Sequence, residues 1–381
     1  MDLFGDLPEP TQTSAPLQTK DGSQNGGTQD GARKRKPSSG DDDDEEEEEG
    51  EVTKRLCTEG LPAVPAVPGV PVVPVLRGYV AARRGERDEM QDAHVLLPDM
   101  TDLLSTKPKS VSRLSYFAVF DGHGGARASR FAAENLHLNL AKKFPTGESE
   151  NLEKLIKKSL MDTFKQTDEE FLKKASSQKP SWKDGSTATC ALVVDDTVYV
   201  ANLGDSSAVL CRMEPSDGHN KPVTLCLSKE HNPTTYEERM RIQRAGGTVR
   251  DGRVLGVLEV SRSIGDGQYK RCGVISTPDL RRRQLTRNDR FLILACDGLF
   301  KVFSADEAVK FVLNLLQGGE GSEEQKDPSV DPGLDPGLDP GLDPGLDSVL
   351  DSACQQLASE AVRRGCADNV TVILVSISFP K

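Results

Sequence analysis

The sequence lacks the long apolar runs that mark a membrane protein. No window approaches about 18 uninterrupted apolar residues, and the N-terminus, Met1 to Asp6, has no positive stretch followed by an apolar core. We therefore expect a soluble protein that is not secreted.

Cysteine pairs with metal-binding or redox spacing are also missing. The eight cysteines form no Cys-x-x-Cys pair, and most lie in apolar runs where a free thiol behaves as a small hydrophobe. This usage favours a reducing, intracellular compartment. There is no Gly-x-x-x-x-Gly-Lys-Ser/Thr loop and no His-Glu-x-x-His pair, so the usual motifs of a nucleoside triphosphate site and of a zinc hydrolase are absent.

An acidic tail holds most of the net charge. Residues 1–76 contain 16 acidic and 7 basic side chains, and thus nine of the twelve net negative charges of the chain. Residues 1–60 include nine consecutive acids, Asp41 to Glu49, and bury too little apolar surface to offset the entropy of ordering. We expect this tail to be disordered, so its charge argues nothing about what the folded part binds.

Two further segments have the composition of connections. Residues 61–76 are rich in proline and favour an extended linker into a domain of residues 77–381. Residues 318–347 include four Pro-Gly-Leu-Asp repeats, and because proline disrupts helices we expect a surface insert there. In the tail, Arg33 to Lys36 form a basic cluster that fits either a nuclear import signal or simple charge balance.

Hydrophobic periodicity predicts the elements of the domain. Helices are expected at 125–144, at 152–171, from a capping box at Ser304–Glu307 to residue 316, and at 349–364. Strands at 186–194, 197–203 and 206–211 are joined by tight connections, so we expect them to pair as antiparallel neighbours. Antiparallel strands with helical pairs indicate an α+β domain.

The most informative motif is an Asp-Gly pair at the end of an apolar strand. It occurs at Asp121–Gly122 and recurs at Asp297–Gly298, while Asp368 stands just before the final apolar segment. Strand ends could bring these three carboxylates to one spot. Hard oxygen ligands of this kind favour Mg²⁺ or Mn²⁺ over zinc.

A single Asp-Gly pair is most often only a turn. Two more acids, Asp92 and Asp205, stand at comparable places, and five clustered carboxylates would repel one another unless cations neutralised them. A pair of divalent ions is the natural counter-charge.

Seven motifs, in their order along the chain, resemble those of type 2C protein phosphatases, and all of them lie within the region of residues 78–378 that we expect to be folded. They are Arg87-Asp88-Glu89-Met90-Gln91-Asp92-Ala93-His94, Phe120-Asp121-Gly122-His123-Gly124, Gly185-Ser186-Thr187-Ala188, Asn202-Leu203-Gly204-Asp205-Ser206, Ser261-Arg262-Ser263-Ile264-Gly265-Asp266, Cys296-Asp297-Gly298-Leu299 and Asp368-Asn369-Val370-Thr371.

The resemblance implies a two-layer antiparallel β-sandwich flanked by antiparallel helices, with two Mg²⁺ or Mn²⁺ ions per subunit at one edge. It implies that Asp121 bridges both ions, that Gly122 lends its carbonyl oxygen, and that Asp297 and Asp368 hold the first ion. Asp92 would orient water held by the ions. The implied reaction is hydrolysis of phosphoserine and phosphothreonine in proteins, by in-line attack of the water that bridges the ions.

The resemblance also gives roles to two basic side chains. Arg87 matches a phosphate-binding arginine, whose guanidinium can meet two phosphate oxygens. The alternative is a surface arginine in a basic stretch. His123 matches the proposed general acid for the leaving oxygen, and the competing interpretation is a histidine that orients water.

Residues 229–251 resemble the family's flap beside the active site, with a helix at 235–245. The charged residues of this helix, Glu238 and Arg241 among them, are most simply a solvated face.

Two positions depart from the family pattern. Gln91 replaces a common Glu, which weakens the expected binding of the second ion. Lys301 stands where many members carry an Asp that helps Asp205 to hold a third ion, so we do not expect that ion and Asp205 stays a structural or transient ligand. These departures keep open the alternative of a weakly active or inactive phosphatase-fold binding protein.

The resemblance further implies a monomeric signalling enzyme with phosphoprotein substrates, in cytosol and nucleus. The tail and linker resemble those of members associated with integrin-linked kinase, which adds that kinase as an expected partner. Nucleic-acid binding rests only on residues 33–36, which the adjacent acids largely neutralise, so we expect neither nucleic-acid binding nor membrane insertion.

Overall fold

The computed structural model of the chain describes residues 73–216, 219–318 and 344–380, which belong to one compact unit, Val67–Lys381. The predicted disordered tail with its basic cluster, residues 61–72 of the linker and residues 319–343 of the insert lie outside the described residues.

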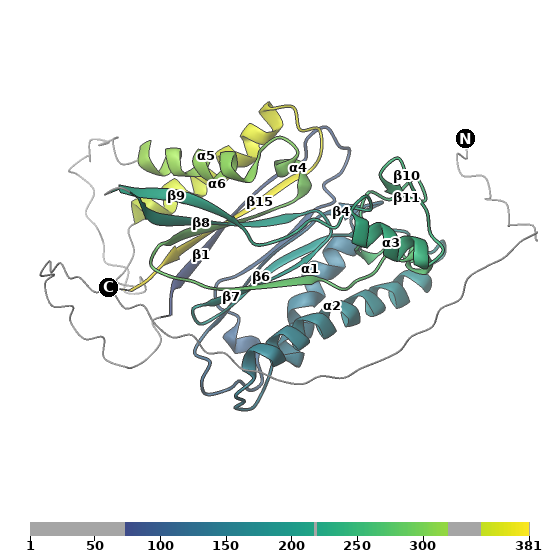
Figure 1. The fold of residues 1–381 in the computed structure, drawn as a ribbon, viewed down its shortest axis with the longest axis horizontal. Helices are drawn as coiled ribbons and strands as arrows, with labels where there is room; N and C mark the ends of the chain where they lie inside the picture. Colours follow the sequence, from purple (N-terminus) through teal and green to yellow (C-terminus); the bar gives the residue numbers. More distant parts are fainter. Residues whose placement is uncertain (1–72, 217–218, 319–343, 381) are drawn as a thin grey trace, which may run out of the picture. The chain divides into compact units, whose positions relative to one another are not determined.

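Two five-stranded antiparallel sheets form the centre of this unit (Figure 1). The first sheet has the order β1 (Val75–Arg83), β15 (Val370–Ser378), β14 (Asp289–Ala295), β8 (Ser207–Ser216), β9 (His219–Cys226). The second sheet has the order β13 (Asp279–Gln284), β7 (Thr197–Leu203), β6 (Ala188–Val194), β3 (Leu114–Phe120), β2 (Ala93–Leu97).

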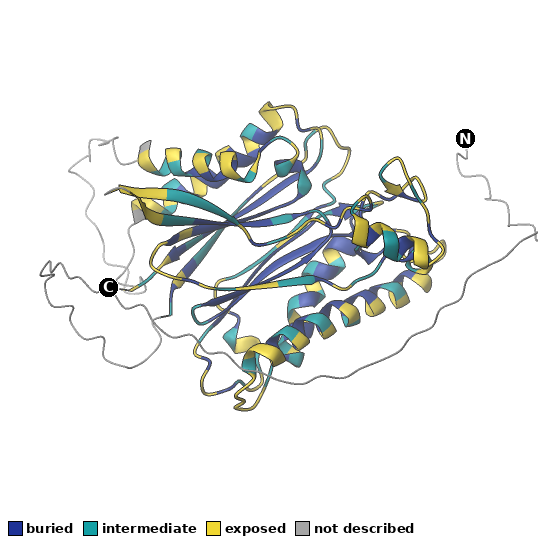
Figure 2. Cartoon of the chain, viewed as in Figure 1, coloured by how far each residue is buried: buried dark blue, intermediate teal, exposed yellow. Residues whose placement is uncertain are grey.

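Helices cover the outer face of each sheet. The helices α1 (Arg127–Lys143) and α2 (Leu152–Ser176) pack on the second sheet, and α5 (Ala305–Gly318) and α6 (Pro344–Arg363) pack on the first. Figure 2 shows buried strands in the centre and exposed outer faces on the helices. The predicted α+β sandwich flanked by helices is confirmed.

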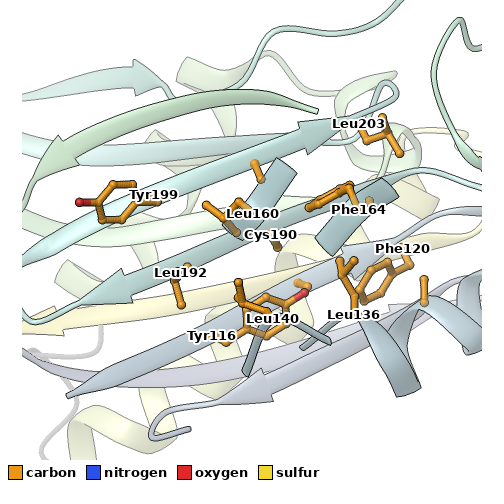
Figure 3. Packing of buried hydrophobic residues seen from close by; sticks show 14 of the residues in the cluster. Tyr116, Phe120, Leu136, Leu140, Leu160, Phe164, Cys190, Leu192, Tyr199 and Leu203 are labelled. Atoms are coloured by element: carbon orange, nitrogen blue, oxygen red, sulfur yellow. The ribbon is translucent and has the colours of Figure 1, made fainter. Parts of the chain in front are cut away.

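The central strands are buried on both faces, which explains their nearly continuous apolar sequences. In β3 every residue is buried. Tyr116 and Phe120 point toward α1 and α2, where Figure 3 shows them with Leu136 and Phe164, while the alternate residue Phe117 packs between the two sheets. This alternation follows from the two-residue period of a strand.

The predicted pairing of the three strands is half right. Strands β6 and β7 pair as expected, but β8 belongs to the other sheet. The connection through Gly204 and Asp205 crosses between the sheets instead of making a hairpin. Gly204 has φ +101°, and both its N–H and its carbonyl bond to His231. A short polar connection between two predicted strands therefore does not show that the two strands pair with each other.

The expected helices are confirmed, but α2 continues past its predicted end at residue 171 to Ser176, and α6 starts earlier than predicted. The capping box forms, because the backbone N–H of Ser304 donates to Glu307 at 2.8 Å and the Glu307 N–H donates back at 3.2 Å. Helix α6 begins at Pro344, so the last repeat of the insert is helical and the surface-loop prediction is wrong for residues 344–347. Proline is tolerated there because the first helical position has no intrahelical N–H bond to lose.

Several short elements complete the unit. They are a three-stranded sheet of β12 (Ile264–Gly265), β5 (Gly185–Ser186) and β4 (Gly122–His123), the hairpin of β10 (Val249–Arg250) and β11 (Arg253–Val254), helices α3 (Tyr236–Arg244) and α4 (Asp297–Phe300), and 3-10 turns at Thr101–Leu103 and Lys270–Cys272. Helix α3 confirms the predicted helix at 235–245. Among the described helices, none combines the length and hydropathy needed to cross a membrane.

Candidate metal and phosphate site

The antiparallel topology brings the predicted acids to one edge of the sandwich. Strands β3 and β7 both pair antiparallel with β6, so they run in the same direction and end together, and β2 begins beside the end of β3. In the first sheet, β14 ends where β15 begins. These ends carry Asp92 before β2, Asp121 after β3, Asp205 after β7, Asp297 after β14 and Asp368 before β15.

Carboxylate oxygens of Asp121, Asp205 and Asp297 lie within 4.8 Å of one another. Asp121 also forms a second group of this size with Asp92 and the thiol of Cys296. Cys296 was not expected in the site, because the last residue of an apolar run resembles a small hydrophobe, although it stands directly before Asp297. Asp205, which was expected to be a structural or transient ligand, stands inside the cluster.

The clustered carboxylates resist ionisation in the absence of a cation. Burial, and then the charges of Asp92 and Asp297, raise the pKa of Asp121 well above its ordinary value. Burial and the charge of Asp297 raise the pKa of Asp205 to about 7. These directions are expected of like charges that lie close together and are partly removed from water.

Only one of the two carboxylate oxygens of Asp92 has a hydrogen-bond partner among the described residues. Its Oδ2 accepts a hydrogen bond from the Thr371 hydroxyl at 2.7 Å, while Oδ1 is buried and has no hydrogen-bond partner among the described residues. Burial raises its pKa to about 6, against the effect of the Thr371 bond. An unpartnered buried oxygen beside Asp121 fits a site that receives a cation or its water.

Backbone and hydroxyl bonds hold Asp121 and Asp205 in place. The N–H of Asp121 donates to Thr187 Oγ1 at 3.1 Å, and the N–H of Thr187 donates to the Asp121 carbonyl at 2.9 Å. The Thr187 hydroxyl also lies 2.8 Å from that of Ser206, which follows Asp205. Thr187 therefore connects the ends of β3 and β7.

The small three-stranded sheet positions His123. Pairing of β4 and β12 with β5 places His123 Nε2 2.7 Å from Asp266, whose side chain is 2% exposed. Burial lowers the pKa of His123, but the charge and hydrogen bond of Asp266 outweigh burial and leave that pKa above its ordinary value. Asp266 is the last residue of the motif that begins at Ser261, but no sequence pattern predicted its contact with His123.

Two glycines leave the space that this arrangement needs. A side chain at Gly185 would collide with His123 Nε2 and the Asp266 carboxylate, and one at Gly122 would collide with the Gln91 carbonyl. That carbonyl accepts a hydrogen bond from Ser129, and the Gln91 N–H donates to Asn369 at 2.8 Å. Gly122 thus permits close approach of two backbone segments next to Asp121.

Two cationic side chains meet Asp368 at the border of the cluster. Its Oδ2 lies 3.0 Å from Arg87 Nη2 and 2.9 Å from Lys301 Nζ, and Lys301 Nζ is also 2.6 Å from Asp297. Burial raises the pKa of Asp368, but its bond to Lys301 and the charges of Lys301 and Arg87 leave that pKa below its ordinary value. The Arg87 side chain is 59% exposed, so a ligand can reach its guanidinium although it pairs with Asp368.

A cavity of about 370 Å³ opens over Asp205 and Asp297. The hairpin β10–β11 contributes Arg253 to its wall, and Glu230 and Glu259 add acidic side chains. Figure 1 shows β4, β10, β11 and α3 together at one end of the sandwich. Residues 229–251 therefore do lie beside the cluster.

The prediction of a solvated charged face on α3 is wrong for two residues. Glu238 is 4% exposed and bonds Arg241 at 2.6 Å and Arg262 at 2.7 Å. Arg262 also forms an ion pair with Asp279 on β13, at 2.8 Å. Although burial opposes it, bonding to these arginines lowers the pKa of Glu238. The helix is thus fastened to the second sheet by buried ion pairs.

Comparison with known proteins gives concordant matches. The family model described as Protein phosphatase 2C matches residues 77–370. A protein of Bos taurus named "Integrin-linked kinase-associated serine/threonine phosphatase 2C" is 54% identical over 100% of both chains. The protein of the same name from Homo sapiens is 61% identical over 79% of this chain and 72% of its own length.

A solved structure shows the same fold. The serine-threonine phosphatase 2C of Toxoplasma gondii aligns with a TM-score of 0.60 at 22% identity, over 81% of this chain and 98% of its own. With the family model spanning most of the sandwich and its carboxylate edge, the chain belongs to the protein phosphatase 2C family of protein serine/threonine phosphatases.

Proposed function

We propose that this chain hydrolyses phosphoserine and phosphothreonine in proteins with the aid of two divalent cations, Mg²⁺ or Mn²⁺, and that it acts in intracellular signalling. The observation that carries the proposal is the convergence of Asp121, Asp205 and Asp297 within 4.8 Å, beside the unpartnered oxygen of Asp92.

The donor set fits such cations. Most of the clustered ligand atoms are carboxylate oxygens, which suit Mg²⁺ and Mn²⁺. The neighbouring negative charges, which raise the pKa values of Asp121 and Asp205, also need a counter-charge. We assign Asp121 to both ions, Gly122 through its carbonyl, and Asp297 and Asp368 to the first ion. When bound, the ions would acidify water for in-line attack and offset the charge that develops on the phosphoryl group.

The remaining steps belong to side chains of this chain. Arg87 stands beside Asp368 with an exposed guanidinium, which can pair with two oxygens of a phosphate and orient it. His123 is held by Asp266 and keeps a raised pKa, which supports donation of its proton to the leaving serine or threonine oxygen. The flap closes one side of the cavity in which the substrate would lie.

The experiment is hydrolysis of a phosphothreonine peptide with Mn²⁺, Mg²⁺ or chelator. We expect turnover that requires metal and falls by more than about 100-fold in Asp121→Ala and Asp297→Ala, because losing a ligand costs more than losing its supporting partner. Asp306→Ala, an exposed acid on α5, is the matched control. Metal-independent turnover, or equal rates in the three variants, would contradict the assignment.

A weakly active or inactive binding protein is the second candidate, because Lys301 bridges Asp297 and Asp368 and so occupies two proposed ligands. The two candidates differ in one result. Binding of phosphopeptide without metal-dependent phosphate release, at Mn²⁺ concentrations that saturate the site, would favour the binding protein.

We further propose that the enzyme is a monomer. We propose that it acts in cytosol and nucleus, which the basic cluster supports, and that integrin-linked kinase is among its partners, which the names of its relatives support. Deleting residues 33–36 tests nuclear entry, and an unchanged distribution would remove that proposal. Co-purification with the kinase tests the partner.

A further inference from the structure

Lys301 makes an internal ion-pair bridge at the candidate metal site. It follows α4, and its Nζ lies 2.6 Å from Asp297 Oδ2 and 2.9 Å from Asp368 Oδ2. The two carboxylates come from segments 71 residues apart, at the end of β14 and the start of β15. One ammonium group thus neutralises two of the acids assigned to a cation.

The ammonium and a divalent ion cannot share these oxygens. Mg²⁺ binds its oxygen ligands at about 2.0–2.1 Å, so an ion held by Asp297 and Asp368 would lie within the volume that Lys301 Nζ fills. Two cations at such separation also repel strongly. Binding of an ion to these two oxygens would therefore displace the Lys301 side chain.

The surroundings of Lys301 allow that movement. Its side chain is 45% exposed and lines the cavity of about 370 Å³, together with Glu230 and Glu259. A flexible four-carbon stem can carry the ammonium from the carboxylate pair toward Glu230 in this cavity, whereas Glu259 already pairs with Arg253.

We propose that Lys301 is a built-in counter-ion that competes with the divalent cation for Asp297 and Asp368. In the metal-free protein it holds the ends of β14 and β15 together. On metal binding it moves into the cavity, so the side chain lowers the affinity for metal while it stabilises the metal-free fold. The inference rests on the proposed metal site and does not depend on the rate of phosphate hydrolysis.

The test compares Lys301→Met with Lys310→Met, which removes an exposed lysine on α5 and changes the net charge equally. Titration calorimetry with Mn²⁺ should show about ten-fold tighter binding to Lys301→Met than to the natural chain, since two partly exposed ion pairs no longer oppose the ion. Lys310→Met should bind as the natural chain does.

Thermal unfolding supplies the second readout. In chelator, Lys301→Met should melt roughly 2–4 °C lower than the natural chain, because the carboxylates lose their counter-charge, whereas in saturating Mn²⁺ it should melt at the same temperature or higher. Lys301→Arg, which keeps the charge, should restore both the metal-free melting temperature and the weaker affinity. This pairing of opposite effects is not expected of a lysine that only stabilises the surface.

Equal or weaker Mn²⁺ affinity in Lys301→Met would overturn the inference, as would an unchanged melting temperature in chelator. These failures are distinct from failure of the proposed function. If the natural chain binds no Mn²⁺, the metal site itself is refuted, whereas metal-dependent turnover with an affinity insensitive to Lys301 refutes only the competition.

Discussion

The Nε2 atom of His123 lies 2.7 Å from an oxygen of Asp266, which stands 143 residues further along the chain. Because Asp266 raises the pKa of His123, their charged pair stabilises the fold below the ordinary histidine pKa. That contribution is lost as pH rises through the pKa of the folded state. The same carboxylate therefore governs both the charge and the orientation of the proposed acid.

Replacing Asp266 by Asn should lower the pKa of His123, since the attractive charge disappears while burial remains. The alkaline limb of the pH–rate profile should move to lower pH, because the proposed acid loses its proton earlier. Titration of the imidazole signals by NMR measures the shift directly. His137 on α1 is the internal control, and an unmoved His123 signal would refute the role of Asp266.

Arg87→Lys should raise KM for a phosphopeptide by about 10-fold to 100-fold, because an ammonium cannot make the paired bonds of a guanidinium and hydrogen bonds to charged groups are worth about 1.5–3 kcal/mol. Steady-state kinetics in saturating metal check this. The nearby exposed Arg84→Lys should leave KM unchanged. Equal effects at both positions would support the surface interpretation of Arg87.

The metal-free protein should lose stability as pH rises from about 4 to 7. Asp92 and Asp205 have folded-state pKa values of about 6 and about 7, raised by burial, so the folded state holds protons that the unfolded chain has already released. Melting curves in chelator at several pH values measure the slope. Saturating Mn²⁺ should remove it, and identical slopes with and without metal would contradict the clustering.

Glu238→Ala should destabilise the domain by about 3–5 kcal/mol, because two arginines then lose their buried partner. Urea denaturation provides the measurement. The neighbouring Glu237→Ala, whose side chain is 79% exposed, should change stability by less than about 0.5 kcal/mol. If Glu238→Ala changed the free energy of unfolding as little as Glu237→Ala does, the charged residues of α3 would be a solvated face after all.

Sequence patterns predicted the features that depend on local periodicity and chain order. The Asp-Gly pair at Asp121 follows a strand whose apolar residues are unmistakable, and the capping box at Ser304 needs only its own four residues. The order of the motifs then indicated the family, which the comparisons confirm.

Features that depend on distant partners were missed. Asp266 meets His123 only through strands of two residues each, which have no detectable period. Glu238 reads as a surface charge because its partner Arg262 lies 24 residues away, and Gly204–Asp205 reads as a hairpin turn although it changes sheet. In each case tertiary contacts outweighed the local pattern.

The apolar layer between the sheets has a chemical consequence. Asp121 follows β3 of the second sheet and Asp297 follows β14 of the first, so the side chains that pack between the sheets, Val119 and Leu294 among them, set how far apart the two strand ends lie. Substitutions that enlarge or shrink the side chains of this apolar layer would change the distance between the Asp121 and Asp297 carboxylates without altering either carboxylate.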